Sequence, residues 1–219
     1  MILKVENIGK NFQQGRTTIH ALKAITFSMQ ERESLAIVGP SGSGKTTLLS
    51  LLAGLDFPTT GNIAIDNACI TSMSEKKLAY FRSHNIGIVF QQYHLMPYLT
   101  AEENVSLPLE IMRETNVQKR AQEILEMVGL SNRLNHFPHQ MSGGECQRVA
   151  IARASVVRPK ILLADEPSGN LDSQTGGKVM DLLFSLSAES AMTLILVTHD
   201  MQLAARCQRQ IHMLDGSLQ

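Results

Sequence analysis

The segment Gly39-Pro-Ser-Gly-Ser-Gly-Lys45-Thr46 constrains the fold more than any other part of the chain. It follows the apolar run SLAIV, which is typical of a buried strand, and it precedes a helical pattern that stops at Gly54. Its glycines allow consecutive backbone N–H groups to curl around a phosphate chain, and the following helix presents its positive N-terminal end. The segment fits the P-loop pattern and predicts nucleotide binding, in which Lys45 reaches the β- and γ-phosphates and the Thr46 hydroxyl ligates Mg²⁺.

Short segments rich in Ile, Val and Leu predict strands around this loop. They cover residues 3–8, 24–29, 34–38, 62–65, 86–90, 161–164 and 193–198. The runs SLAIV, ILLAD and TLILVT are almost continuously apolar, which is typical of strands covered on both faces in a parallel sheet. The first, second and fourth segments alternate more, and they favour a small antiparallel sheet near the N-terminus.

Helical patterns lie between these strands. Thr100 and Glu103 have the spacing of a capping box, and residues 117–128 place their apolar side chains on one face before Gly129. We therefore expect a single α/β domain over residues 1–219, with a helical subdomain of about residues 92–158 inserted in its core.

Composition excludes several classes of protein. The 20 Lys and Arg residues balance the 20 Asp and Glu residues, and this neutral total argues against a protein that binds nucleic-acid phosphates. The three cysteines are widely spaced and form no CxxC pair, so we expect a reducing compartment rather than disulfides or a zinc site. No segment has the pattern of a signal peptide or the ~20 apolar residues of a membrane-spanning helix. We expect a soluble intracellular chain that would serve a membrane only from its surface.

Two further motifs carry groups suited to phosphate chemistry. Asp165 and Glu166 end an apolar strand, where Asp165 could hold Mg²⁺ and Glu166 could polarise an attacking water. Ser142-Gly143-Gly144-Glu145 has capping-box spacing, but two glycines in a first helical turn are costly unless anionic oxygens must approach the backbone. A strand that runs into a polar turn and a well-capped helix are the simpler alternatives.

Together, GPSGSGKTT, MSGGECQRVAIARA and ILLADEPSGNLD resemble the Walker A, signature and Walker B plus D-loop motifs of ABC-type ATPases. Order and spacing match over essentially the whole chain. The resemblance also identifies Gln91 as similar to the Q-loop glutamine, His199 as similar to the switch histidine and Phe12 as similar to the aromatic residue that stacks on adenine. It implies a RecA-like P-loop core, an antiparallel β-subdomain and an inserted helical subdomain.

The resemblance further implies residue roles, with ATP and Mg²⁺ as the bound groups. The catalytic residues would be Glu166 as general base, His199 and Gln91. The metal would be held by Thr46, Gln91 and Asp165. ATP would be bound by Phe12, Gly39, Pro40, Ser41, Gly42, Ser43, Gly44, Lys45, Thr46 and Thr47 of one chain and by Ser142, Gly143, Gly144 and Glu145 of a second. The dimer is then head-to-tail and ATP-dependent, with Asp172 near its seam.

The motif details resemble the subgroup that includes the LolD, MacB and YbbA ATPases. Met141 and Glu145 replace the commoner Leu and Gln, Phe12 replaces the commoner Tyr, and Cys146 occupies a position that is usually polar. The resemblance implies a separate integral membrane permease with a periplasmic domain, and membrane contact only through it at the cytoplasmic face of the bacterial inner membrane. It implies no nucleic-acid partner. The cargo could be a lipoprotein, a lipid or another hydrophobic compound, exported or extracted from that membrane, and a mechanical rather than a transport role also stays open.

Two other functions have to be weighed. A soluble ABC ATPase of DNA repair or translation uses the same motifs, but such proteins typically carry tandem cassettes, long coiled-coil insertions or basic linkers. A P-loop kinase explains Lys45 but leaves the signature, His199 and the carboxylate pair without a role.

One loop is unusually apolar for a surface segment. In residues 92–99, QYHLMPYL, six of eight residues are apolar or aromatic. The loop follows Gln91 and precedes the helix start at Thr100. It either packs on the helical part of its own chain or receives a helix of the permease.

Overall fold

A computed structural model describes residues 1–219. The chain divides into two compact units, one of residues 1–82 and 193–219 and the other of residues 83–192. Helix α2 (Glu75–Asn85) crosses from the first unit to the second. The segment of about residues 92–158, expected to be helical, falls within the second unit, and the single domain over residues 1–219 stays a prediction.

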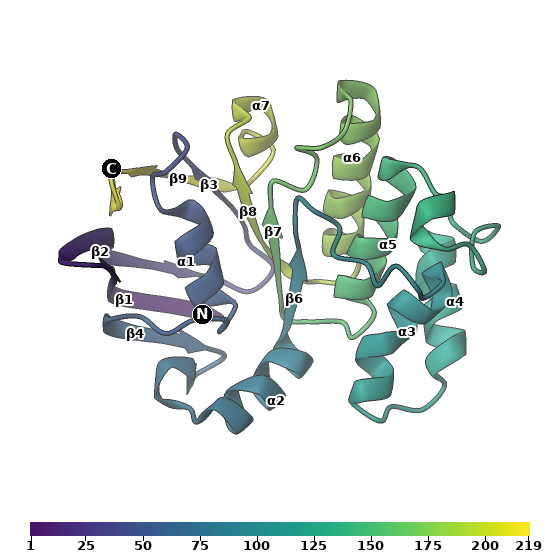
Figure 1. Ribbon diagram of the computed structural model, residues 1–219, viewed down its shortest axis with the longest axis horizontal. Helices are drawn as coiled ribbons and strands as arrows, with labels where there is room; N and C mark the ends of the chain where they lie inside the picture. Colours follow the sequence, from purple (N-terminus) through teal and green to yellow (C-terminus); the bar gives the residue numbers. More distant parts are fainter. The chain divides into compact units, whose positions relative to one another are not determined.

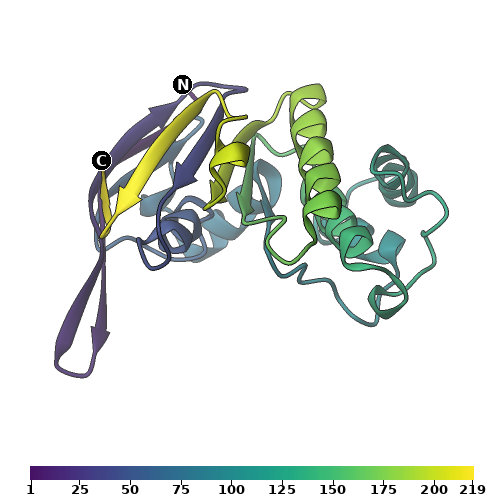
Figure 2. The same ribbon diagram turned by 90° about the horizontal axis from the view of Figure 1, so that it is seen from above.

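An antiparallel sheet at the N-terminus belongs to the first unit. It contains β1 (Leu3–Gln14), β2 (Thr17–Met29), β4 (Thr60–Ile65) and β5 (Ala68–Cys69), in the order β2-β1-β4-β5. The alternating strands thus form the small antiparallel sheet that was expected. Strands β1 and β2 run well past the predicted residues 3–8 and 24–29 and form a long ribbon that turns at Gly15 (Figure 2).

A parallel arrangement surrounds β3 (Ser34–Val38) in the same unit. Its neighbours β8 (Thr193–Thr198) and β9 (Arg209–Leu214) are both parallel to it, and β10 (Ser217–Leu218) pairs antiparallel with β9. The side chains of β8 are all buried, as its continuous apolar sequence predicts. Helix α1 (Lys45–Leu52) follows β3 through the P-loop, and the short α7 (Met201–Ala204) follows β8.

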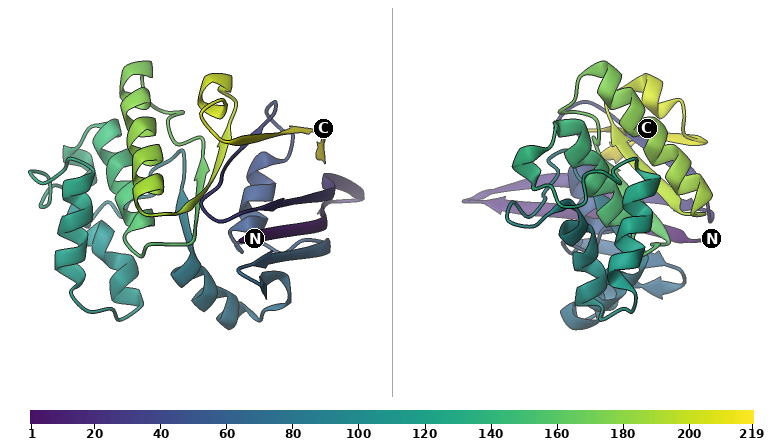
Figure 3. Two further views of the ribbon diagram at one scale, coloured as in Figure 1. Left: turned by 180° about the vertical axis from the view of Figure 1, so that it is seen from behind. Right: turned by 90° about the vertical axis from the view of Figure 1, so that its right-hand side faces the viewer.

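The second unit combines two parallel strands with a group of helices. Strand β6 (Ile86–Val89) pairs with β7 (Ile161–Asp165). Helix α3 (Ala101–Ile111) packs on α4 (Val117–Met127) and on α5 (Gly143–Ser155), and α5 also packs on α6 (Ser173–Glu189), as Figures 1 and 3 show. Both predicted capping boxes are present, at Thr100 and at Ser142. None of the helices combines the length and the apolar composition that crossing a membrane requires.

Candidate nucleotide-binding site

The P-loop joins β3 to α1 by a turn that only glycine can make easily. Gly44 has a φ of 99°, and a Cβ atom there would lie 2.7 Å from the carbonyl oxygen of Ala21. The side chain of Lys45 is folded back over the loop and is only 7% exposed. Its Nζ donates to the carbonyl oxygens of Gly39 and Pro40, at 2.8 Å each. The loop therefore holds a buried ammonium group on neutral acceptors, which anionic oxygens could replace with a stronger interaction.

The polar groups of the loop fit a phosphate chain. The hydroxyl oxygen of Ser43 is buried and has no hydrogen-bond partner, which is unusual for a buried polar atom. Helix α1 begins after Gly44 with no side-chain cap, so no side chain satisfies the N–H groups of its first turn. The side chain of Thr46 is exposed in that same turn. Unpaired donors, a cation and a positive helix end are together what a nucleotide's phosphates require.

Two other predicted residues of the first unit lie outside the loop. Phe12 is 43% exposed on the β1–β2 ribbon, and the Nζ of Lys10 lies 5.0 Å from the centre of its ring. Phe12 is therefore not the core residue that its apolar character would suggest, and its ring already takes part in a cation–π contact. His199 follows β8 and is exposed, and the next residue, Asp200, caps α7 by accepting from the N–H groups of Gln202 and Leu203.

The carboxylate pair belongs to the second unit. Asp165 is the last residue of β7, and Glu166 follows with a φ of 43°, in the left-handed region that residues other than glycine seldom occupy. The turn closes where the N–H of Gly169 donates to the carbonyl oxygen of Glu166, at 2.9 Å. Backbone strain of this kind is common at functional sites, because the surrounding structure must hold the residue in place.

Gln91 lies against this same turn. Its Nε2 donates to Oδ1 of Asn170 at 3.2 Å, and Nδ2 of Asn170 donates back to the carbonyl oxygen of Gln91 at 3.0 Å. A Cβ atom on Gly169 would lie 2.8 Å from Nε2 of the Gln91 side chain, so a side chain at this position would displace the Gln91 amide. The structure thus brings Gln91 next to the residues that follow Glu166.

The signature segment begins α5 as a complete capping box. The Ser142 hydroxyl accepts from the N–H of Glu145 at 3.3 Å, and the Glu145 carboxylate accepts from the N–H of Ser142 at 2.8 Å. Beside it lies a hollow of about 560 Å³, lined by Ser142, Gly144 and Glu145 together with the cationic side chains of Arg148 and Lys178. Ser142 is exposed at the helix start, where an anionic ligand is favoured.

Sequence reasoning missed the residues that fasten the segment around Gln91 to α5. Arg153 donates from Nη1 to the carbonyl oxygen of His94 and from Nη2 to that of Tyr93, at 2.6 and 2.9 Å. Gln147 is fully buried and donates to the carbonyl oxygen of Phe90 at 3.2 Å. The available signal was a polar or charged side chain within the apolar run of α5, since such groups are buried only with partners.

Asp172 has a structural role of its own. Its Oδ1 accepts from the N–H groups of Gln174 and Thr175 and caps α6. A hydrogen bond with the Thr175 side chain, followed by these backbone hydrogen bonds, holds the pKa of the carboxyl below its ordinary value. The expected place at a dimer seam stays a prediction.

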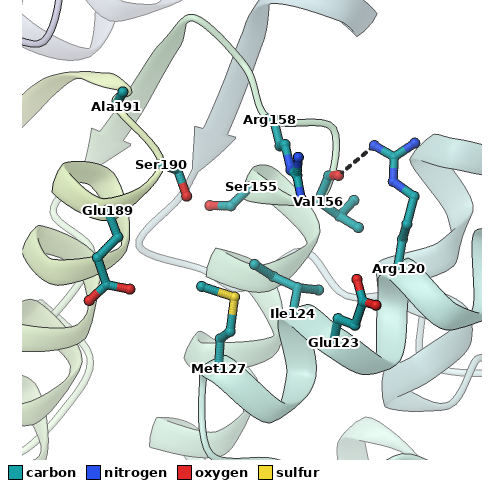
Figure 4. Close-up of a pocket in the computed structure, with 10 residues that line it drawn as sticks. All are labelled: Arg120, Glu123, Ile124, Met127, Ser155, Val156, Arg158, Glu189, Ser190 and Ala191. Carbon is teal, nitrogen blue, oxygen red and sulfur yellow. Dashed lines mark hydrogen bonds between the residues drawn. The ribbon is translucent and has the colours of Figure 1, made fainter.

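A second hollow of the same unit, of about 510 Å³, contains none of the predicted site residues. It lies where α5 and α6 end, and α4 forms its other side; Arg120 donates to the carbonyl oxygen of Val156 at its edge (Figure 4). The candidate site therefore has two parts. The first unit carries Phe12, the P-loop and His199, and the second carries Gln91, the carboxylate pair, the signature and Asp172.

Comparison with known proteins places these motifs in context. A family described as "ABC transporter" matches residues 22–169. The chain is 46% identical to the lipoprotein-releasing system ATP-binding protein LolD of Bordetella pertussis over 219 residues, which are 99% of this chain and 95% of that protein. It is 47% identical to the uncharacterized ABC transporter ATP-binding protein YbbA of Escherichia coli K12 over 220 residues, or 100% and 96% of the two chains.

Solved structures agree with these relatives. A dimeric, post-hydrolysis form of the ATP-binding cassette MJ0796 with ADP and Pi has a TM-score of 0.91 and 43% identity, and the match covers 100% of this chain and 97% of that chain. The cbiO1 protein of Clostridium perfringens, part of the complex cbiONQ, has a TM-score of 0.88 and 33% identity over 100% and 86% of the two chains. The likeness extends over the whole chain.

Proposed function

The chain belongs to the ABC transporter family and is an ATP-hydrolysing subunit of an ABC transporter. On that premise we propose that it drives a separate integral membrane permease. The observation that supports this proposal most is identity of 46–47% over essentially the full length with transporter subunits named LolD and YbbA. We infer from this that the permease has a periplasmic domain and that the chain works at the cytoplasmic face of the inner membrane, attached only through the permease.

The two parts of the site would perform different steps. In the first unit, Lys45 exchanges its two carbonyl partners for the β- and γ-phosphates, the Ser43 hydroxyl gains a phosphate acceptor, and Phe12 stacks on the adenine. His199 contacts the γ-phosphate region. In the second unit, Glu166 accepts the proton of the attacking water. Asp165 and Gln91 of that unit, together with the Thr46 hydroxyl of the first unit, would hold Mg²⁺. That ion would neutralise charge on the β- and γ-phosphate oxygens.

The signature would complete the site of a second copy. In a head-to-tail dimer, Ser142, Gly143 and Gly144 of one protomer would contact the nucleotide on the P-loop of its partner. An exposed helix start with small residues and two cations nearby suits this role. The dimeric cassettes among the similar structures support it. Loss of the γ-phosphate contacts on hydrolysis would then open the dimer.

The cargo follows from the relatives alone. LolD belongs by name to a lipoprotein-releasing system. We propose that the cargo is a lipoprotein, a lipid or another hydrophobic compound that is extracted or exported from the inner membrane. The alternative within the same function is mechanical work on a membrane partner without transport. Purification of the tagged chain from detergent-solubilised membranes should yield a permease with a large periplasmic domain. Recovery with nucleic acid at low salt, and with no membrane protein, would favour a role in repair or translation instead.

Replacing Glu166 tests the catalytic assignment. Glu166→Gln removes the base but keeps the shape of the side chain, so ATP binding should persist while kcat falls by roughly 10²–10⁴-fold. Because ATP then remains between the protomers, an ATP-dependent dimer should accumulate. Phosphate release and light scattering measure the two effects.

The matched control is Glu189→Gln, which changes an exposed carboxylate at the end of α6 within the same unit. It should leave both turnover and oligomeric state unchanged. Turnover by Glu166→Gln close to that of the unsubstituted protein would rule out Glu166 as the base.

A further inference from the structure

Arg133 joins the loop before α5 to the capping box of the signature. Its Nε lies 2.8 Å from Oε1 of Glu145, while the other carboxylate oxygen, Oε2, accepts from the N–H of Ser142 at 2.8 Å. The two oxygens of one carboxylate are thus divided between a cation and the backbone of the signature serine. The side chain of Glu145 is only 17% exposed, and that of Arg133 is 35% exposed.

The loop holds Arg133 firmly in this position. Its N–H donates to the carbonyl oxygen of Leu130, its carbonyl oxygen accepts from the N–H of His136, and its Nη1 lies 3.3 Å from Nε2 of His136. The hydrogen bonds from Arg133 and from the Ser142 backbone lower the pKa of Glu145 to about 2, so the carboxylate is ionised at any physiological pH.

An ionised carboxylate at this point creates a problem for phosphate binding. It contacts the backbone N–H of Ser142, where the proposed nucleotide of the partner brings further negative charge. A neutral glutamine would complete the same capping box without that repulsion. A guanidinium in direct contact offsets the negative charge of Glu145, whose carboxylate also hydrogen-bonds the Ser142 side chain, so the same charge pair holds the serine hydroxyl in place.

We infer that Arg133 is a positioning residue for the trans-acting signature: it neutralises Glu145 and fixes, through that carboxylate, the orientation of Ser142 toward the partner's nucleotide. This inference rests on the proposed head-to-tail dimer. It assigns a residue outside the signature sequence to the ATP-dependent contact between protomers.

The test measures ATP-dependent dimerisation with every chain carrying Glu166→Gln to prevent hydrolysis. Arg133→Ala should raise the ATP concentration needed for half-maximal dimerisation roughly tenfold, because a charge-assisted hydrogen bond is lost. Arg133→Lys should restore part of this loss. In a Glu145→Gln background, Arg133→Ala should change dimerisation by no more than about twofold, since no charge remains to be neutralised.

The matched control is Arg120→Ala, which removes another half-buried arginine of the same unit, paired with Glu114 at 3.1 Å. It should leave dimerisation unchanged, and its melting temperature should fall at least as far as that of Arg133→Ala. If the role of Arg133 were purely structural, dimerisation would instead weaken in every variant, Arg120→Ala included, in proportion to the fall in its melting temperature.

Mixed dimers locate the effect in trans. When Arg133→Ala chains are mixed with Lys45→Ala chains, one site combines an intact P-loop with an intact signature, so dimers should form as with Lys45→Ala and unsubstituted chains. When one chain carries both substitutions and its partner neither, the one intact P-loop meets the altered signature, and dimerisation of this pair should be roughly tenfold weaker. Equal dimerisation in the two mixtures overturns the inference.

A separate variant, Ser142→Ala, distinguishes this inference from the proposed dimer. If Ser142→Ala also has no effect on dimerisation, the proposed dimer itself is wrong. If Ser142→Ala alone has an effect, the proposed dimer stands and only the role of Arg133 is rejected.

Discussion

The three thiols show how strongly the chemistry of one residue depends on its surroundings. Cys69 is half-buried in β5, its Sγ lies 3.3 Å from the hydroxyl of Thr71, and hydrogen bonds from Thr71 and Ser72 lower the pKa of the thiol below its ordinary value. Cys146 and Cys207 are buried, and desolvation raises the pKa of both thiols, that of Cys207 to about 11. Cys146, which departs from the polar residue expected in the signature, is therefore a packing residue.

Alkylation should follow these surroundings. The thiolate is the reactive form, so iodoacetamide at neutral pH should label Cys69 first and leave Cys146 and Cys207 largely unmodified until the protein is unfolded. Peptide mass spectrometry over a time course measures the order. Cys69→Ser should remove the early label. Early modification of Cys207 in the native protein would contradict this account of the buried thiols.

Contacts between residues near in sequence could be predicted, and contacts between distant residues could not. The capping boxes at Thr100 and Ser142 were predicted because their partners lie three residues away. The pair of Gln91 with Asn170 joins positions 79 residues apart, and that of Arg153 with Tyr93 joins positions 60 apart. Their geometry depends on how strands and helices pack, which no local pattern in a single sequence encodes.

At the scale of elements, α5 and α6 approach closely because Gly144 has no side chain. A Cβ atom on Gly144 would lie 2.4 Å from the methyl carbon of Thr175, on the first turn of α6. Gly144 is buried, and the contact is therefore part of the packing between the two helices. Gly144 thus serves the packing of the two helices, and the access of a nucleotide to the helix start stays a prediction.

Substitution of Gly144 should be destabilising in the absence of nucleotide. Gly144→Ala overpacks the contact and should lower the free energy of unfolding by about 1–3 kcal/mol, and Thr175→Ser, which removes the methyl group, should restore most of it. Denaturant unfolding of both single variants and the double variant measures the coupling. Gly177→Ala on α6 is the control, because a Cβ atom there meets nothing within 4 Å; it should be neutral or stabilising by up to ~1 kcal/mol. Additive effects of Gly144→Ala and Thr175→Ser would show that the two residues do not compete for space.

The elements that sequence reasoning missed have weak patterns for physical reasons. Strand β9, RQIHML, mixes polar and apolar side chains because only part of it is buried. The outer half of the β1–β2 ribbon is exposed, so its sequence lacks the buried apolar positions from which a strand is predicted. In contrast, β3 and β8 have the residues predicted for them, because each is an almost continuously apolar run that is buried along most of its length.

For the whole molecule, the open question is where a membrane partner would touch it. Residues 92–99 follow Gln91 and form a loop whose backbone is held by hydrogen bonds to a buried side chain. Asn104 is fully buried; its Oδ1 accepts from the N–H of Met96, and its Nδ2 donates to the carbonyl oxygens of Met96, Leu99 and Thr100. The loop backbone is therefore fixed, yet Tyr98 is 89% exposed. Leu95 is half-buried. One of the two expected uses of this loop was packing on the chain's own helices. That use does not account for the exposure of Tyr98.

A rigid loop that presents an exposed tyrosine suits docking to a permease helix, because tyrosine contributes strongly to binding at low conformational cost. Tyr98→Ser should keep the melting temperature and the basal ATPase activity but weaken co-purification with the permease roughly tenfold or more. Leu95→Ser should weaken it too, with some loss of stability. Ile111→Ser is the control, since Ile111 is 70% exposed at the other end of α3, about 15 Å from Thr100. If Tyr98→Ser retains the permease while Ile111→Ser loses it, the partner binds elsewhere on α3. If Tyr98→Ser instead lowers the melting temperature with permease binding intact, the tyrosine stabilises its own chain and does not dock the permease. The reason is that an exposed ring that serves only docking contributes nothing to the free energy of unfolding of the isolated subunit.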